Sequence, residues 1–170
     1  MKKSILLLIT AALIGIDQLL KKWAVEALAS KITIPVIPRV FSLTYVENRG
    51  AAFGFLQGRA GILAVFTGAI LAVMAFLLFA GRLKGRRLIS GAVLILAGGV
   101  GNLIDRASQG FVVDYLDVSP LISFPVFNFA DCCVVIGTGL LAWYLISSEI
   151  SSHNPDLPSE PKDVPPHEQI

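Results

Sequence analysis

The sequence AGILAVFTGAILAVMAFLLFAG, residues 60–81, decides the class of fold, because none of its 22 residues carries a charge. An α-helix needs about 20 apolar residues to cross the ~30 Å hydrocarbon core of a bilayer. Residues 88–104 and 132–148 are also uncharged, over 17 residues each, and residues 4–20 contain one charge, at Asp17. The sequence therefore predicts four membrane-spanning helices, over about residues 4–22, 60–81, 88–106 and 130–147.

The overall composition points to the same class of protein. Of the 170 residues, 55% are hydrophobic and 15% are charged, whereas soluble domains carry about 25% charged residues. An ordinary water-soluble domain is excluded. A wholly disordered chain is excluded too, because it would need low hydrophobicity and a high net charge. The net charge is +2, and we expect no nucleic-acid partner.

The C-terminal end differs in composition from the rest of the chain. From Ser148 onward there are five acids and one base, together with five of the nine prolines. Such a segment cannot bury a core. The sequence therefore predicts one membrane domain over residues 1–147 and a disordered cytoplasmic tail over residues 148–170. Cys132 and Cys133 are adjacent in an apolar run and indicate neither a disulfide framework nor a zinc site.

The distribution of basic residues predicts the orientation in the membrane. An even number of spans puts both termini on one side, and four bases lie in the short segment from Arg82 to Arg87. Because short basic loops face the cytoplasm, we expect both termini there and the loop of residues 23–59 outside. The first span could instead be a cleaved signal peptide, but Lys21 and Lys22 lie between its apolar run and the Ala-Leu-Ala sequence at 27–29 that would fit a cleavage site.

The first outer loop has two parts with different compositions. Residues 32–46 are rich in β-branched and aromatic side chains and are interrupted by Pro35 and Pro38, which predicts two or three short strands in a small sheet on the membrane surface. Residues 51–56 are mostly apolar and predict a short interfacial helix. An apolar surface outside the membrane indicates contact with lipid or a lipid-like ligand.

Ionisable and amide side chains beside membrane spans are functional candidates, because they are costly there. The predicted topology places seven of them at one membrane face: Asp17, Asn48, Asn102, Asp105, Asp114, Asn128 and Asp131. Reversing the orientation moves all seven together, so their convergence does not depend on it. The glycines at 98, 99 and 101 favour close approach of another helix just below this face.

Several of these residues also suit ordinary structural roles. Asp17 and Lys21 are spaced as an (i, i+4) pair, and Asp105 is expected to form a local ion pair with Arg106. Asp117 precedes Ser119 and Pro120, a pattern typical of a turn. The asparagines at 48 and 102 suit caps as well as functional positions.

Asp114 and Asp131 have no neighbouring base that would explain them. Asp114 lies within an apolar run, and Asp131 opens an apolar helix, whose N-terminus favours an ionised carboxylate. Two carboxylates at a partly dry site share a proton, so one can act as base for water while the other acts as acid. His153 and His167 both lie in the tail, which leaves no Ser-His-Asp or Cys-His site. A metal site built from Asp and Asn oxygens remains an alternative.

Five motifs, in order and at consistent spacing, carry a resemblance to a known family. They are Asp17-Gln18 followed by Lys21, VENRGAAF at 46–53, GGVGNLIDR at 98–106, VVDYL at 112–116 and FNFAD at 127–131. Together they resemble bacterial signal peptidase II, the lipoprotein signal peptidase family, over all of the chain except the tail. Tyr115 stands where Phe is common in that family.

The resemblance implies an all-α membrane protein of four transmembrane helices with a small extracytoplasmic sheet and an interfacial helix. It implies a monomeric aspartyl endopeptidase of the bacterial inner membrane, without cofactor or metal, that works near the outer face. Its partners would be membrane lipid and prolipoproteins, cut before their diacylglyceryl-modified cysteine. The implied catalytic dyad is Asp114 and Asp131, and the implied supporting residues are Asp17, Asn48, Gly50, Asn102, Asp105, Arg106 and Asn128. Asn48 and Asn128 are expected to hold the substrate backbone.

The residues alone leave a second function open. A small proton-coupled transporter would also have acids in its membrane domain, but these would be spread across the membrane thickness.

Overall fold

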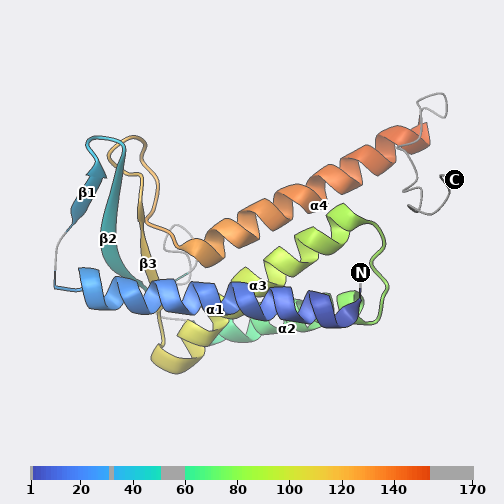
Figure 1. Cartoon of the computed structure of the whole chain (residues 1–170), viewed down its shortest axis with the longest axis horizontal. Coiled ribbons are helices and arrows are strands. Elements are labelled where there is room, and N and C mark those ends of the chain that lie inside the picture. The colour runs from blue at the N-terminus through green and yellow to red at the C-terminus, as the bar shows by residue number, and fades with distance from the viewer. Residues whose placement is uncertain (1, 31–32, 51–59, 154–170) are drawn as a thin grey trace, which may run out of the picture.

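The computed structural model of the chain describes residues 2–30, 33–50 and 60–153. Its helices gather into one bundle, and its strands form a sheet at one end of that bundle (Figure 1). The elements in chain order are α1 (Lys3–Leu28), β1 (Ile34–Ile37), β2 (Phe41–Asn48), α2 (Ala60–Phe79), α3 (Arg86–Gln109), β3 (Val112–Asp117) and α4 (Phe129–His153).

Three of the helices, α1, α3 and α4, are long and apolar enough to cross a membrane. Helix α2 has 20 residues, and its Val65 and Phe66 side chains are 76% and 66% exposed in the isolated chain. Such outward-facing apolar side chains suit contact with lipid tails, and α2 as a fourth span stays a prediction. The interfacial helix expected at residues 51–56 lies outside the described residues.

Two helices extend beyond their predicted ends. Helix α1 continues to Leu28 rather than residue 22, because Ala24 and Leu28 bury their side chains against the sheet. Helix α4 continues to His153, past the predicted boundary at residue 147. Neither glycine nor proline occurs between Leu140 and His153, so nothing in this stretch breaks the helix.

The sheet is antiparallel with the order β1-β2-β3. Strands β1 and β2 come from the connection between α1 and α2, and β3 comes from the connection between α3 and α4. The sequence predicted strands within residues 32–46 and missed β3, which follows α3. All but one residue of β3 is buried, so its sequence lacks the alternation of apolar and polar side chains that marks a half-exposed strand. Val46 lies opposite Asp114, and Asn48 lies opposite Val112, which puts Asn48 diagonally across from Asp114 on the same face.

One apolar cluster joins α1 to the sheet and fixes the position of Asp114. Ala24 and Leu28 of α1 pack with Val113 and Tyr115 of β3, the residues on either side of this aspartate. Successive side chains of a strand point to opposite faces. Because Val113 and Tyr115 face α1, the strand turns Asp114 away from this apolar cluster.

Helix α3 lies at the centre of the bundle. Three of its glycines each allow the close approach of a different helix. A Cβ atom at Gly98 would collide with the carbonyl oxygen of Ala130 in α4. One at Gly99 would lie 2.5 Å from Leu71 of α2, and one at Gly101 would collide with Asp17 of α1. The predicted close helix approach is confirmed, and it involves three helices rather than one.

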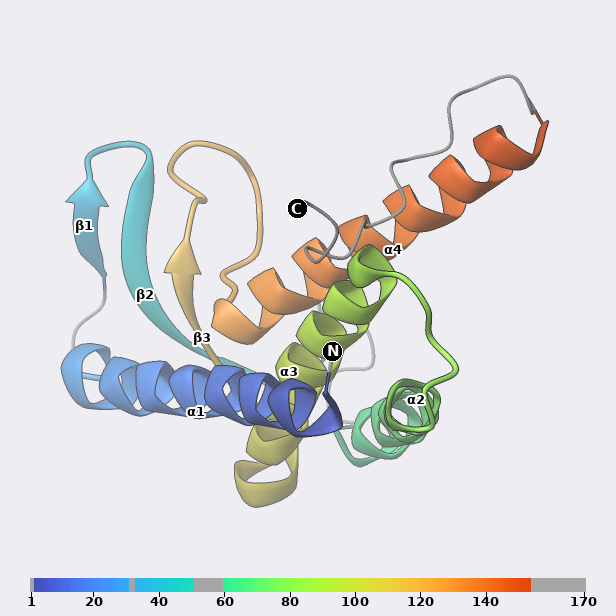
Figure 2. The same cartoon turned by 45° about the vertical axis from the view of Figure 1, so that its right-hand side comes forward.

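The two ends of the bundle differ in the elements that they carry. The start of α1, the end of α4 and the connection between α2 and α3 lie at the end opposite the sheet (Figure 2). This arrangement agrees with an even number of passes across the bilayer. The polar residues discussed below belong to the end of the bundle beside the sheet.

Candidate active site

Asp114, in the middle of β3, is buried and bonded through both carboxyl oxygens. Its side chain is almost fully buried, and the residue is 2% exposed. The amide of Asn48 donates to Oδ2 at 2.9 Å, and the amide of Asn128 donates to Oδ1 at 2.6 Å. Burial raises the pKa of Asp114 from 3.8 to about 6, and the negative charge of Asp131 adds to the rise while the two hydrogen bonds oppose it.

This raised pKa predicts a titration near pH 6. Because folding favours the protonated form, the stability contributed by Asp114 is present at acidic pH and is lost as the pH rises through about 6. Infrared difference spectra between the wild type and Asp114→Asn should show the carboxyl band disappearing with that midpoint. In Asp131→Asn the midpoint should move to lower pH, because a repelling charge has gone. A midpoint near 3.8 in the wild type would contradict the burial of Asp114.

Asp131 lies in the first turn of α4 and takes part in closing that turn. Its Oδ2 accepts the backbone N–H of Asn128 at 3.1 Å, while its own N–H donates to Oδ1 of Asn128 at 2.9 Å. This reciprocal pair is a capping box, which satisfies two helix N–H groups that would otherwise lack partners. The amide of Asn102 in α3 donates to Oδ1 of Asp131 at 2.8 Å. The capping box and the amide of Asn102 together hold the carboxylate in one orientation.

Asn128 links the two aspartates. It is fully buried, its Nδ2 donates to Asp114, and its Oδ1 accepts from Asp131. The same Nδ2 lies 3.2 Å from Oδ1 of Asn102. The amides of Asn48 and Asn128 both donate to Asp114, and their role in holding the substrate backbone stays a prediction.

A second polar group lies beside the first and is centred on Lys21 of α1. Its Nζ is 2.9 Å from Oδ2 of Asp17, 2.9 Å from Oδ2 of Asp105 and 2.9 Å from Oδ1 of Asn102. The predicted pair with Asp17 is confirmed, but the sequence did not place Lys21 in the site. Its position four residues after Asp17, on the same face of an apolar helix, was the available signal.

Asp17 and its neighbour Gln18 tie α1 to the other elements of the site. Oδ1 of Asp17 accepts the backbone N–H of Ala130 at 3.0 Å, in the first turn of α4. The amide of Gln18 donates to Oδ1 of Asp105 at 3.0 Å and approaches the carbonyl of Gly101 at 3.2 Å. Gln18 was not predicted as a site residue, because its role is seen only in its contact with Asp105, 87 residues later in the chain.

The predicted local ion pair between Asp105 and Arg106 is wrong. Consecutive helical residues point in different directions, and here Asp105 binds Lys21 and the N–H of Val113. Arg106 instead donates to the carbonyl of Gly50 at 3.1 Å, and the N–H of Gly50 donates to Oδ1 of Asn48 at 3.0 Å. Arg106 is also close enough to interact electrostatically with both proposed catalytic carboxylates.

These contacts join all nine predicted site residues into one network. Lys21 connects the group around Asp17 and Asp105 to the group around Asp114 and Asp131 through its contact with Asn102.

Asp117 lies outside this network. Its carboxylate accepts from the N–H of Ser119 at 2.8 Å and from the hydroxyl of Thr44 at 2.9 Å, so the predicted turn role is confirmed. Within the described residues, no group of three or more His, Cys, Asp or Glu is arranged to hold a metal ion.

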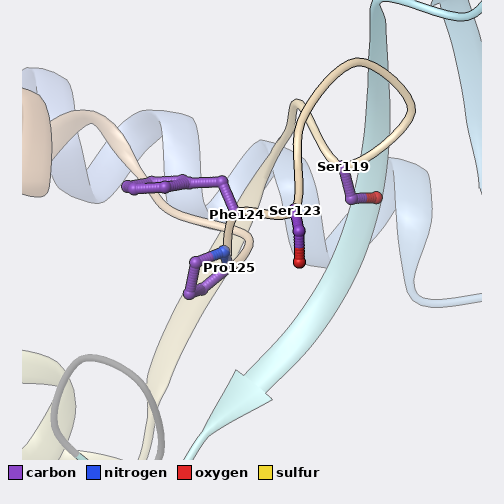
Figure 3. Close-up of a pocket in the computed structure, with 4 residues that line it drawn as sticks. All are labelled: Ser119, Ser123, Phe124 and Pro125. Carbon is purple, nitrogen blue, oxygen red and sulfur yellow. The ribbon is translucent and has the colours of Figure 1, made fainter.

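A separate hollow of about 420 Å³ lies in the connection between β3 and α4 (Figure 3). Its lining among the described residues is Ser119, Ser123, Phe124 and Pro125. None of these side chains belongs to the polar network. The candidate site is therefore defined by its linked carboxylates and amides rather than by this hollow.

Comparison with known proteins places this chain in a family. Residues 9–147 match the family model described as signal peptidase (SPase) II. The lipoprotein signal peptidase of Clostridioides difficile is 46% identical over 150 residues, covering 86% of this chain and 97% of that protein. That of Halothermothrix orenii is 42% identical over 142 residues, covering 84% of this chain and 95% of that protein.

Solved structures give the same result for the fold. A bacterial membrane enzyme determined by the in meso method at 2.3 Å resolution has a TM-score of 0.77 and 28% identity, with 96% of each chain covered. A second, at 1.9 Å resolution, has a TM-score of 0.74 and 30% identity, covering 85% of this chain and 94% of its own. The chain is thus an integral membrane peptidase, and it belongs to the signal peptidase II family.

Proposed function

We propose that the protein is an intramembrane aspartyl endopeptidase that removes signal peptides from prolipoproteins, cutting before the diacylglyceryl-modified cysteine. The observation that carries the proposal is the linkage of Asp114 and Asp131, from a strand and a helix start, through the buried side chain of Asn128. The substrate class rests on the relatives, which are lipoprotein signal peptidases.

The surroundings of the two carboxylates support different roles for them. Asp131 is only half-buried, so water can reach its carboxylate more readily than that of Asp114. Asp114 is almost fully buried, and burial raises its pKa to about 6. Asp131 is therefore the base, and Asp114 carries the shared proton and is the acid.

The reaction follows from these two protonation states. Ionised Asp131 takes a proton from a water molecule, and the resulting hydroxide attacks the scissile carbonyl carbon. Asp114 gives its proton to the carbonyl oxygen, which stabilises the charge that develops there. As the tetrahedral intermediate collapses, Asp131 passes its proton to the leaving amine and Asp114 recovers a proton from the hydroxyl group. The dyad returns to its starting state, and the peptide bond has become an acid and an amine.

The arrangement of the molecule supports a site near the outer face of the bacterial inner membrane. The polar network belongs to the end of the bundle beside the sheet. The connection between α2 and α3, which carries the bases Arg82, Lys84, Arg86 and Arg87, lies at the opposite end with the start of α1 and the end of α4. The basic end would face the cytoplasm. A transporter would distribute its acids through the membrane thickness, and the gathering of these acids at one end favours the peptidase. We propose that it acts as a monomer on lipid-modified precursors.

Purified protein incubated with a diacylglyceryl-modified prolipoprotein tests this function. We expect cleavage before the modified cysteine, unchanged by a chelator, because no metal takes part in the proposed chemistry. The unmodified precursor is the matched control and should be cleaved far more slowly. Loss of cleavage with chelator would replace the dyad by a metal site, and equal cleavage of both precursors would remove the claim of lipid recognition.

A further inference from the structure

Lys21 is a buried cation that the proposed reaction does not use. Its side chain is 4% exposed, and a buried ammonium group is costly unless its donors are all paired. Lys21 meets this requirement with three acceptors, each at 2.9 Å: Asp17, Asp105 and Asn102. Two of them are carboxylates that balance charge. The third is a neutral amide, which charge balance alone does not explain.

The contact with Asn102 fixes which way its amide group faces. An ammonium group can only donate, so it selects the oxygen Oδ1 of Asn102 rather than Nδ2. The amide of Asn128 also donates to this oxygen, at 3.2 Å. With Oδ1 occupied on one side, Nδ2 of Asn102 points to the other side and donates to Oδ1 of Asp131 at 2.8 Å.

We propose that Lys21 is a positioning residue for the peptidase reaction, acting through the amide of Asn102 on Asp131. This proposal rests on the proposed dyad. By fixing the Asn102 amide, Lys21 keeps a donor aimed at Asp131, and this donor holds the carboxylate in the orientation needed to accept a proton from water. Loss of that donor would let Asp131 turn, and misplacement of a reacting group by about 1 Å costs about 100-fold in rate.

A role in charge balance makes a different prediction. Lys21 lies against Asp17 and Asp105, and the other charged groups near this network are Asp114, Asp131 and Arg106. If Lys21 served only to neutralise Asp17 and Asp105, removal of one of these carboxylates together with the lysine would restore activity. If Lys21 acts through Asn102, the same change would leave the rate low.

Steady-state cleavage of a diacylglyceryl-modified prolipoprotein tests the proposal. Lys21→Met should lower kcat about 100-fold and change KM less than about threefold, because substrate binding does not involve this group. Lys22→Met is the matched control. Lys22 is an exposed lysine one residue further along α1, paired at 4.0 Å with Glu26, and its substitution should leave both constants unchanged.

A double-mutant cycle separates positioning from loss of folded protein. Once Asn102→Ala has removed the donor, adding Lys21→Met should lower kcat no further, even if thermal unfolding shows additive destabilisation. Equal fold-losses in both backgrounds would overturn the proposal.

A charge-matched pair covers the case in which Lys21→Met fails to fold. Lys21→Met with Asp105→Asn should remain about 100-fold slower than Asp105→Asn alone, and equal rates for this pair would show charge balance instead. Full activity of Asp131→Asn would reject the proposed catalytic dyad, and with it the proposed function. An inactive Asp131→Asn beside a fully active, folded Lys21→Met would reject the positioning role alone.

Discussion

Asp114→Asn and Asp131→Asn are each expected to abolish cleavage, with a fall in kcat of about 10⁴-fold. An amide at position 131 cannot accept a proton from water at neutral pH, and an amide at position 114 cannot supply one to the carbonyl oxygen. Asparagine retains an oxygen for the hydrogen bond from Asn128 at each position. Its Nδ2 would face the amide donor of Asn48 at position 114 or of Asn102 at position 131, so we expect folded variants with a modest loss of stability. The measurement is cleavage of a lipid-modified precursor by purified protein, with thermal unfolding recorded alongside.

Asp117→Asn is the matched control for this pair. Asp117 lies on the same strand as Asp114 and is also buried, but its carboxylate binds Ser119 and Thr44. Asparagine supports the same turn, so cleavage should be unchanged. Full activity in either dyad variant, or equal loss in Asp117→Asn, would show that the carboxylates serve the fold rather than the chemistry.

Gly98→Ala should destabilise the protein by about 3 kcal/mol and lower activity in the folded fraction. The new Cβ would collide with the carbonyl oxygen of Ala130 and lie 2.9 Å from Cγ2 of Val134. Overpacking costs about 1–3 kcal/mol, and the upper value applies because the obstacle is backbone, which cannot rotate away. Separation of α3 from α4 would also pull Asp131 from Asn102, since Asp131 directly follows Ala130.

Gly139→Ala tests whether this effect comes from the helix contact. Among the described residues, nothing lies within 4 Å of a Cβ at Gly139 of α4, and alanine is the better helix former. The unfolding temperature in detergent and the cleavage rate should both stay at or above wild type. Equal unfolding temperatures for the Gly98 and Gly139 variants would mean that the close approach of α3 and α4 is not needed.

The elements predicted from the sequence are those encoded by local patterns. The apolar runs of α1, α3 and α4 are continuous along the chain, and their length against the bilayer thickness is sufficient to identify them. The third strand is different, because β3 is recognisable through its pairing with β2, more than 60 residues earlier. The six residues of β3 carry no local sequence pattern that would reveal a pairing with residues so far away in the chain.

The composition of the site was predicted better than its contacts. Topology alone placed the acids of separate spans at one face, because each lies toward the same end of its predicted span. The partners of each acid depend on helix rotation and depth, which the apolar pattern does not fix to within a single contact. Asp105 therefore faces Lys21 rather than Arg106, and the lysine at the centre of the network was seen only as the neighbour of Asp17.

The capping box at the start of α4 has a consequence for the newly made protein. One of its two members is the proposed base Asp131, and α4 is the last helix that the structure describes. Until α4 has formed, Asp114 keeps its hydrogen bond from Asn48 but lacks both the second carboxylate, Asp131, and the hydrogen bond from Asn128. The proposed dyad is therefore complete only when the last described helix has formed.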